Sequence, residues 1–214
     1  VTNRNIFKDV WIHYHVVDES GRKMSKSLGN FIDPQEILKK YGTEPFRLWT
    51  SIEGNITNDD FKCSFERIEG AGKTITKLWN IARFVSSFRY KYKPSHTTEA
   101  DKWIIQEINE LIGFALLSYE NYDFHNPATK LKHFIWETFA SHYLELVKSR
   151  AYNQHGLFSV DEQDSALYTL NYCLDVLLKL LAPVVPIITY KIYKDLRLKD
   201  IHKERFPEVD HEYK

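Results

Sequence analysis

Apolar residues recur every three or four positions along most of the chain beyond residue 60, the spacing of one face of an amphipathic helix. This pattern predicts four long helices: one from about Asp60 or Gly72 to Tyr90, and others at about 98–122, 126–152 and 161–182. A shorter helix is predicted at 186–196. Short connections between long amphipathic helices are typical of an antiparallel bundle, which we expect over residues 59–214.

The first 58 residues follow a different pattern. Residues 10–17 are rich in β-branched and aromatic side chains and predict a strand. Two short helices are predicted between Asp33 and about Ser51, each opened by a capping residue and a proline. Because no other segment offers a convincing strand, we expect the partners of this strand to be missing. The predicted fold class is therefore mainly α, with a helical bundle preceded by the end of another domain at residues 1–58.

The first long helix has two unlike faces. At about 100° per residue, one side carries an apolar stripe, formed by Ile75, Leu78, Trp79, Ala82 and Val85. The opposite side carries Lys73, Lys77, Asn80 and Phe84. Rings that stack on unpaired bases, beside cations that follow the phosphates, are typical of binding to single-stranded nucleic acid. We therefore predict a nucleic-acid contact at these four residues; the alternative is that another helix packs on Phe84.

The charges of the chain balance, but they are unevenly placed. Lys and Arg number 29 and Asp and Glu number 29, so the formal net charge is zero and a uniformly basic surface is excluded. From Gly70 to Thr98 there is no acidic residue, whereas six cations lie in this window: Lys73, Lys77, Arg83, Arg89, Lys91 and Lys93. A local basic surface is therefore expected around the first long helix.

The segment from Gly21 to Asn30 has the composition of a phosphate-binding loop. It places two ammonium groups, on Lys23 and Lys26, among small hydroxyl side chains, with a glycine towards each end. Glycine permits backbone angles that other residues avoid, so such a loop can open and close. Two ammonium groups on a mobile loop can approach the β- and γ-phosphates of ATP and stabilise the charge that develops as pyrophosphate departs.

Residues 23–27, Lys-Met-Ser-Lys-Ser, resemble the signature loop of the class I aminoacyl-tRNA synthetases, with a predicted strand before it and a helix after it. The resemblance implies that residues 1–58 are the end of a Rossmann-type catalytic domain and that the bundle binds the tRNA anticodon. It also implies ATP contacts at five residues: Lys23, Met24, Ser25, Lys26 and Ser27. Lys23 and Lys26 would be catalytic, with Mg²⁺ accompanying the ATP, and the anticodon would meet the helix that bears Lys77 and Phe84.

Three helical stretches narrow the resemblance. Residues 76–84 and 134–150 are similar to the valyl-tRNA synthetases, the first of them more than to the isoleucyl, leucyl or methionyl enzymes, and residues 178–193 resemble the broader subgroup. The resemblance thus implies tRNA(Val) as the partner, and isoleucine is the rival amino acid. The HIGH-type histidine motif and the amino-acid pocket of this class are not visible, and His13 and His15 lie in the wrong place to serve as that motif. We therefore expect the C-terminal part of a longer ligase, inactive alone, with ATP and valine bound only by the longer enzyme.

Two alternatives are left open by the sequence. One is a separate tRNA-binding module that uses Lys23 and Lys26 only as contacts to the RNA backbone. The other is a helical interaction domain whose basic face binds an acidic protein. Steep loss of affinity with salt would favour RNA over protein, because binding to RNA releases counterions.

The remaining features exclude several functions. There is no apolar run long enough to span a bilayer and no secretory leader, so we expect a cytoplasmic protein with neither a membrane nor a DNA partner. Cys63 and Cys173 are expected to be buried thiols, and the scattered histidines predict no metal site. Trp103, Phe134 and Tyr143 are expected in the core. Lys148 and Arg150 close the third long helix, where cations suit the helix dipole.

Overall fold

The computed structural model describes all residues except 1–6, 11–14, 55–59 and 214. Near the N-terminus, β1 (Val16–Val17) pairs in parallel with β2 (Phe61–Lys62), with Val16 opposite Phe61. The prediction that this strand has no partner in the chain is wrong, because β2 is too short to show an alternating pattern. Most of the predicted strand at 10–17, like the predicted domain boundary after residue 58, falls on or beside residues outside the described ranges.

Two short helices follow the signature loop, as predicted. They are α1 (Pro34–Tyr41) and α2 (Thr43–Ile52). The Asp33 carboxylate caps α1 by accepting a hydrogen bond of 2.9 Å from the backbone NH of Gln35, and Pro34 occupies the first turn, where no intrahelical NH bond is lost. These local rules explain why the sequence located α1, whereas α2 begins after Gly42 without a side-chain cap, so the predicted capping residue is not observed there.

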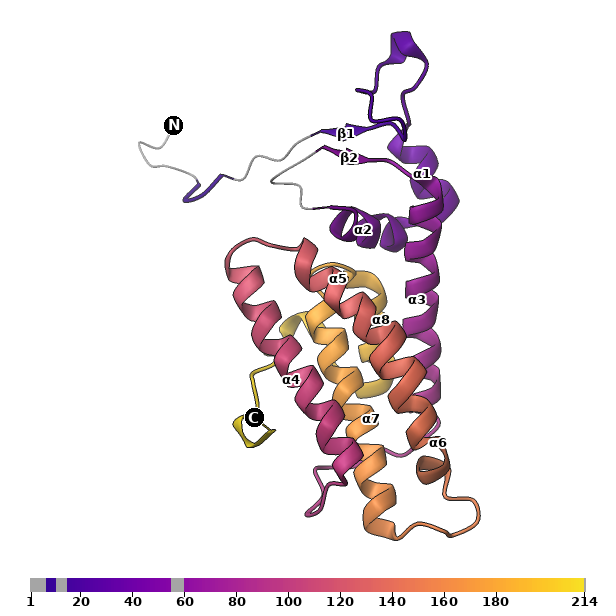
Figure 1. The fold of residues 1–214 in the computed structure, drawn as a ribbon, viewed down its shortest axis with the longest axis vertical. Helices are drawn as coiled ribbons and strands as arrows, with labels where there is room; N and C mark the ends of the chain where they lie inside the picture. The colour runs from indigo at the N-terminus through magenta and orange to yellow at the C-terminus, as the bar shows by residue number, and fades with distance from the viewer. Residues whose placement is uncertain (1–6, 11–14, 55–59, 214) are drawn as a thin grey trace.

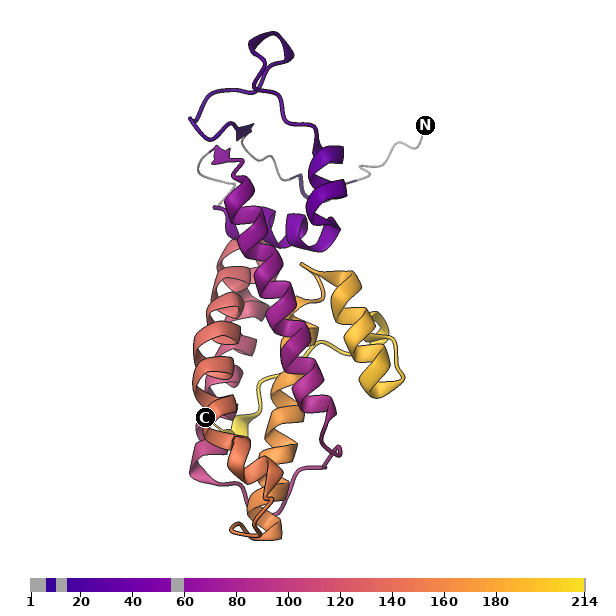
Figure 2. The same cartoon turned by 90° about the vertical axis from the view of Figure 1, so that its right-hand side faces the viewer.

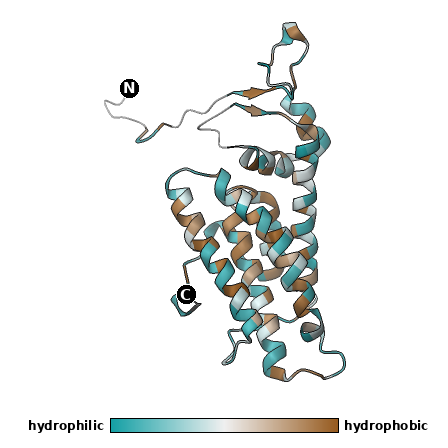
Figure 3. Cartoon of the chain, viewed as in Figure 1, coloured by the Kyte–Doolittle hydropathy of each residue, from teal (hydrophilic) through white to brown (hydrophobic). Residues whose placement is uncertain are grey.

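The bundle consists of four rods that alternate in direction along the long axis of the molecule (Figures 1 and 2). The rods are α3 (Phe65–Ser86), α4 (Glu99–Glu120), the continuous run α5 (His125–His133), η2 (Phe134–Tyr143) and α6 (Leu144–Tyr152), and α7 (Val160–Leu181). A further helix, α8 (Pro186–Arg197), packs against α3 and α7, and the short turns η1 (Lys26–Leu28), η3 (Ile201–Lys203) and η4 (His211–Tyr213) complete the elements. Apolar residues line the inner faces of the rods (Figure 3). The predicted antiparallel bundle is confirmed.

The third rod departs from the prediction in the middle. Residues 134–143 form a π-helix, in which each backbone NH bonds to the carbonyl five residues before it. The buried positions along this segment are therefore four residues apart, at Ile135, Phe139, Tyr143 and Val147. By the end of the segment, the residue that faces the core is one position later than a 3.6-residue period predicts. His142 and Leu146, which the α-helical period places inside, are exposed.

A buried ion pair links three of the rods. The guanidinium of Arg150 donates to both carboxylate oxygens of Asp101, one of them at 2.8 Å, and the Tyr143 hydroxyl donates to the same carboxylate at 2.6 Å. Ser165 of α7 donates to it as well. Asp101 has no exposed surface. Arg150 is thus a buried structural residue, which corrects the expectation of a surface cation at a helix end.

Other core predictions have mixed outcomes. Phe134, Tyr143 and both cysteine thiols are buried, as expected. Burial raises the pKa of the Cys173 thiol well above its ordinary value. Trp103 is 41% exposed, which corrects the prediction of a core residue. Its position on α4 falls on the edge of the buried stripe, where helical spacing alone does not distinguish inside from outside.

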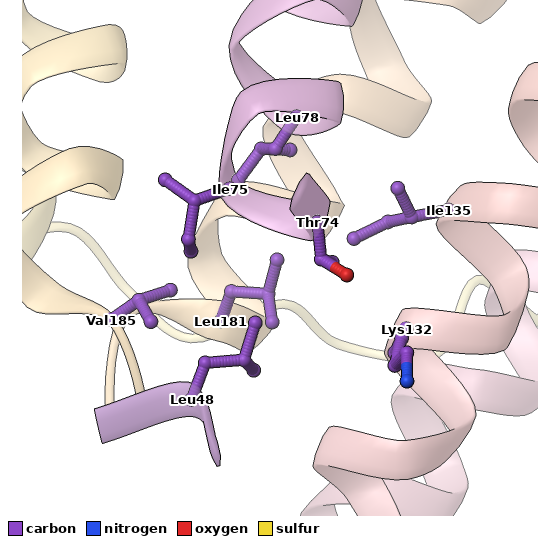
Figure 4. Close-up of a pocket in the computed structure, with 8 residues that line it drawn as sticks. All are labelled: Leu48, Thr74, Ile75, Leu78, Lys132, Ile135, Leu181 and Val185. Atoms are coloured by element: carbon purple, nitrogen blue, oxygen red, sulfur yellow. The ribbon is translucent and has the colours of Figure 1, made fainter. Parts of the chain in front are cut away.

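The N-terminal unit is fixed on the bundle by α2. Arg47 donates hydrogen bonds of 2.9 and 3.1 Å to the carbonyl oxygens of Val184 and Pro183, at the turn between α7 and α8. The Glu44 carboxylate accepts one of 3.0 Å from the NH of Ile188, in the first turn of α8. Where α2, α3, η2 and α7 meet, a small cavity remains among apolar side chains, with Lys132 bounding it on the α5 side (Figure 4).

Candidate functional site

The signature loop lies at one end of the molecule, beyond the strands (Figure 1). It begins as a tight turn, in which the NH of Asp18 donates to the carbonyl of Arg22 at 2.9 Å and Val17 forms an antiparallel bridge with Lys23. Gly21 and Gly29 have φ of 78° and 68°, in the left-handed region that L side chains rarely adopt. The two glycines therefore allow the chain to turn on either side of the two lysines.

A single carboxylate holds the first half of this loop. Asp18 accepts hydrogen bonds from the backbone NH groups of Ser20 and Arg22, at 3.0 and 2.8 Å, and from the Arg22 side chain at 3.1 Å. The side-chain amide of Asn30 donates a fourth, at 2.9 Å. These donors, with Asn30 contributing most, lower the pKa of Asp18 to about 2, so the carboxylate is ionised at neutral pH.

Asn30 joins the far end of the loop to the near end. Its side-chain oxygen accepts a hydrogen bond of 2.8 Å from the NH of Ser25, and its amide nitrogen reaches the Lys23 carbonyl at 3.2 Å as well as Asp18. We call the side chains of Asp18 and Asn30, with these bonds, the Asp18–Asn30 brace. It fixes the backbone on both sides of Met24 while leaving the lysine side chains unconstrained.

The five residues predicted to contact ATP lie together on this braced loop. Lys23, Lys26 and Ser27 are exposed, whereas Met24 and Ser25 are half-buried. The hydroxyls of Ser25 and Ser27 share a hydrogen bond of 2.8 Å, and the Lys26 ammonium lies 5.4 Å from the centre of the Phe31 ring. Both ammonium groups can therefore turn towards an anion without breaking an ion pair within the described residues.

The four residues predicted to contact nucleic acid occupy one edge of α3, but they differ in exposure. Lys73 and Asn80 are exposed, and Lys73 lies 3.5 Å from the Glu69 carboxylate. Lys77 is half-buried, 5.0 Å above the ring of Trp136. Phe84 is also half-buried.

The Phe84 ring packs edge-on against those of Phe88 and Tyr152, with ring centres 5.1 and 6.1 Å away. The ring expected to be open to water is thus part of an aromatic cluster packed against the core, as in the alternative in which another helix packs on Phe84. The sequence did not show this neighbour, because Tyr152 comes from the far end of the third rod.

Part of the predicted basic surface is neutralised by ion pairs. Lys91 pairs with Asp164 of α7 at 2.9 Å, and Lys93 pairs with Glu212 at 2.5 Å. Arg83 and Arg89 are exposed and form no ion pair with another residue that the structure describes. The acids that pair with Lys91 and Lys93 are distant in sequence, so the acid-free window from 70 to 98 overstated the charge of this surface.

Sequence reasoning missed both members of the brace. The sequence patterns assign no role to Asp18 and include Asn30 only as the last residue of the loop. A local signal exists, because aspartate often accepts hydrogen bonds from backbone NH groups two to four residues ahead. The bond to Asn30 spans 12 residues and has no such signal.

Comparisons with known proteins identify the family. The profile described as "Anticodon-binding domain of tRNA ligase" matches residues 101–214, and the profile described as "tRNA synthetases class I (I, L, M and V)" matches residues 1–62. The chain belongs to the class I tRNA synthetases. The signature loop and β2 lie within the second match, and the first match covers more than half of this synthetase chain.

Relatives of this synthetase chain carry the name valine–tRNA ligase. Those of Aeropyrum pernix and Pyrobaculum aerophilum are 39% and 36% identical, each over 97% of this chain and over 25% and 26% of their own lengths. That of Bacillus cereus is 38% identical over 91% of this chain and 22% of its own length. The chain thus spans about a quarter of the length of these relatives.

A solved structure shows the same fold. It is the Agrobacterium radiobacter K84 agnB2 LeuRS in a ternary complex with tRNA and LeuAMS, which superposes with a TM-score of 0.72 at 19% identity. The match covers 94% of this synthetase chain and 24% of that one. At this identity the likeness establishes the architecture, a helical bundle with the signature-loop unit at one end.

Neither a membrane-spanning helix nor a metal-binding cluster is found among the described residues. Among the helices that the structure describes, none combines the length and hydropathy of a membrane span. In the same described residues, no three His, Cys, Asp or Glu side chains gather closely enough to hold a metal ion. The signature loop, with its two lysines, and the basic edge of α3 are the two sets of residues whose function is considered next.

Proposed function

We propose that this chain is the part of a valine–tRNA ligase that supplies the signature loop for ATP and a bundle for tRNA(Val). The observation that carries the proposal is the braced loop, which presents Lys23 and Lys26 to solvent on a fixed backbone. The valine–tRNA ligase relatives, at 33–39% identity over almost the whole chain, support valine over isoleucine. The longer enzyme would join valine to its tRNA with ATP, in the cytoplasm.

In the first step of that reaction, a carboxylate oxygen of valine attacks the α-phosphorus of ATP, the bond between the α- and β-phosphates breaks, and pyrophosphate leaves. Negative charge grows on the departing β- and γ-phosphates. Lys23 and Lys26 would stabilise that charge, which accelerates the step because the interaction strengthens in the transition state. The hydroxyls of Ser25 and Ser27 and the backbone at Met24 would orient the phosphates. Mg²⁺ would arrive with the ATP.

The bundle would bind the anticodon region of the tRNA along α3. Lys73 and Lys77 would meet phosphates, Asn80 would supply an amide, and the half-buried ring of Phe84 would stack on a base. The exposed Arg83 lies on the same helix and adds charge to this edge. No contact with DNA or a membrane is part of the proposal.

Binding tests the tRNA assignment directly. The affinity of the chain would be measured for a tRNA(Val) transcript and for the same transcript with its anticodon replaced, each at two salt concentrations. A preference for the native anticodon is expected. Equal, salt-sensitive binding would leave only a basic surface, because binding to RNA phosphates releases counterions whatever the anticodon.

Phe84→Leu provides the residue test, because leucine keeps apolar contact with Phe88 and Tyr152 but removes the ring. We expect tRNA affinity to fall by about 1–3 kcal/mol, the range for one lost stacking platform. An unchanged affinity would return Phe84 to a purely structural role. ATP–pyrophosphate exchange with valine by this chain alone would contradict the expectation that the longer enzyme is needed.

A further inference from the structure

A groove lined partly by lysines lies between α3 and the third rod, away from the aromatic cluster of Phe84. It has a volume of about 370 Å³, within the range of sites that hold small molecules or a single nucleotide unit. Gly70 and Lys73 of α3 line one side, and Lys132, His133 and Trp136 line the other. Nothing in the function proposed above uses Lys132, His133 or Trp136.

The charges in this groove favour an anion. Lys132 is half-buried and forms no ion pair with any residue that the structure describes. Lys73 stands across the groove and shares its charge with Glu69 at 3.5 Å, and Glu137 also lines the groove. An ammonium without a carboxylate partner gains most from an oxyanion brought by a ligand.

Gly70 leaves one wall of the groove open. It lies inside a 22-residue helix, where glycine is less favourable than alanine, and its φ is not in the left-handed region that would require glycine. A Cβ added at Gly70 would have no neighbour within 4 Å, so packing does not demand glycine either. At Gly72, two positions on, a Cβ would touch Pro45 at 3.6 Å. The missing side chain at Gly70 lets a ligand approach the helix backbone closely.

Trp136 decides which part of a nucleotide fits. Its indole NH donates to the Thr74 hydroxyl at 3.0 Å, which fixes the ring, and Lys77 lies 5.0 Å above the ring centre. A base cannot stack on the face that Lys77 covers. Because its lining includes two lysines, Lys73 and Lys132, the groove suits a phosphate group better than a neutral base.

We propose that this groove holds a ribose–phosphate segment of the bound tRNA, with Lys132 and Lys73 on the phosphate and Gly70 giving the backbone room. This inference rests on the proposed tRNA binding and adds a second contact to it. The contact would be independent of sequence, since phosphates position an RNA without identifying its bases.

The first test compares two lysines of the same rod. Lys132→Gln should weaken binding of the chain to a tRNA(Val) transcript several-fold, equally for the native and the replaced anticodon. It should also reduce the slope of log affinity against log salt by about 0.7–0.9, the value for one phosphate contact. Lys130→Gln is the matched control, because Lys130 lies over the Phe114 ring, 3.7 Å from its centre, and does not line the groove.

The second test fills the groove without changing charge. Gly70→Gln should weaken tRNA binding and leave the thermal midpoint equal or higher, since glutamine favours the helix. Thr76→Gln places the same side chain on an exposed position of α3 outside the groove and should bind as the unsubstituted chain does.

The outcomes separate this inference from the proposed function. If the unsubstituted chain binds tRNA but Lys132→Gln and Gly70→Gln behave like their controls, the groove is not an RNA contact and the inference is overturned alone. If the unsubstituted chain does not bind tRNA, both fail. Loss confined to the transcript with the native anticodon would also overturn the inference, because a phosphate contact cannot depend on the bases.

Discussion

At the scale of single residues, Asp18 shows how one carboxylate can organise a loop. It accepts four hydrogen bonds and is only 7% exposed, although the loop around it projects from the molecule. Backbone NH groups in a turn have no partner in regular structure, and an ionised carboxylate satisfies several at once. The lysines that we propose to act on phosphate can stay mobile because this carboxylate, and not the lysines, shapes the backbone.

Asn30→Ala should loosen the signature loop without unfolding the bundle. The substitution removes the bonds to Asp18, to the Ser25 NH and to the Lys23 carbonyl. We expect faster hydrogen exchange at the Ser25 amide and an unchanged thermal midpoint, because the loop lies outside the core. Ser27→Ala, which removes only the hydroxyl contact with Ser25, is the control. Equal exchange in the two variants would mean that the brace does not order the loop.

The same brace should open in acid. The pKa of Asp18 is lowered to about 2 in the folded chain, against about 3.9 for an unfolded aspartate. A depressed pKa contributes stability that is complete above about pH 4 and is lost as the pH falls towards 2. Amide chemical shifts of Ser20, Arg22 and Ser25 should follow this titration with a midpoint near 2. A midpoint near 4 would show that the carboxylate gains nothing from its donors.

At the scale of elements, the Asp101–Arg150 pair holds α4, α6 and α7 together. Arg150→Met leaves the Asp101 carboxylate buried without its cation, and such a change costs about 3–5 kcal/mol. The free energy of unfolding in urea measures this loss. Lys148→Met, two residues earlier on the same helix, removes an exposed pair with Glu145 and should cost about 0–1 kcal/mol. Similar losses in the two variants would mean that burial gives the Asp101–Arg150 pair no special weight.

The helices show what a sequence predicts well and what it does not. Caps and prolines act on their immediate neighbours, so the starts of α1, α7 and α8 could be located from the sequence. The signature loop was recognisable for the same reason, since its glycines, hydroxyls and lysines are contiguous. The shift of the inward face along the π-helix was not predictable, because its extra residue per turn arises from packing. The partners of Arg150 and of Phe84 are distant in sequence and were missed too.

At the scale of the whole molecule, Glu53 links the N-terminal unit, which carries the signature loop, to the bundle. Its carboxylate, 5% exposed, accepts from the indole NH of Trp49 in α2 at 2.9 Å and from the side chain of Arg67 in α3. Trp49 is itself almost completely buried. Movement of α2 against α3 would break the bond between Glu53 and Arg67, so we expect the two units to unfold together.

Glu53→Ala should therefore lower the stability of the entire chain. It leaves the buried Trp49 NH without an acceptor, which costs about 1–3 kcal/mol. Far-UV circular dichroism, which follows the bundle, and hydrogen exchange in α2 should report the same loss. Glu66→Ala, an acid in the exposed first turn of α3, is the control and should cost less than about 1 kcal/mol. Loss at α2 with an unchanged bundle would show that the units are independent.

Because of its π-helical segment, the third rod can lose one residue and keep its buried face, whereas the neighbouring rods cannot. A π-turn is an α-helical turn with one residue more than it needs. Removing a residue between Trp136 and Ser141 would leave a plain α-helix whose two ends still present Leu131 and Arg150 to the core. The same deletion within α4 or α7 would rotate every following side chain by about 100° and bring polar residues inside. The third rod can thus lose a residue here while both of its buried faces stay in phase.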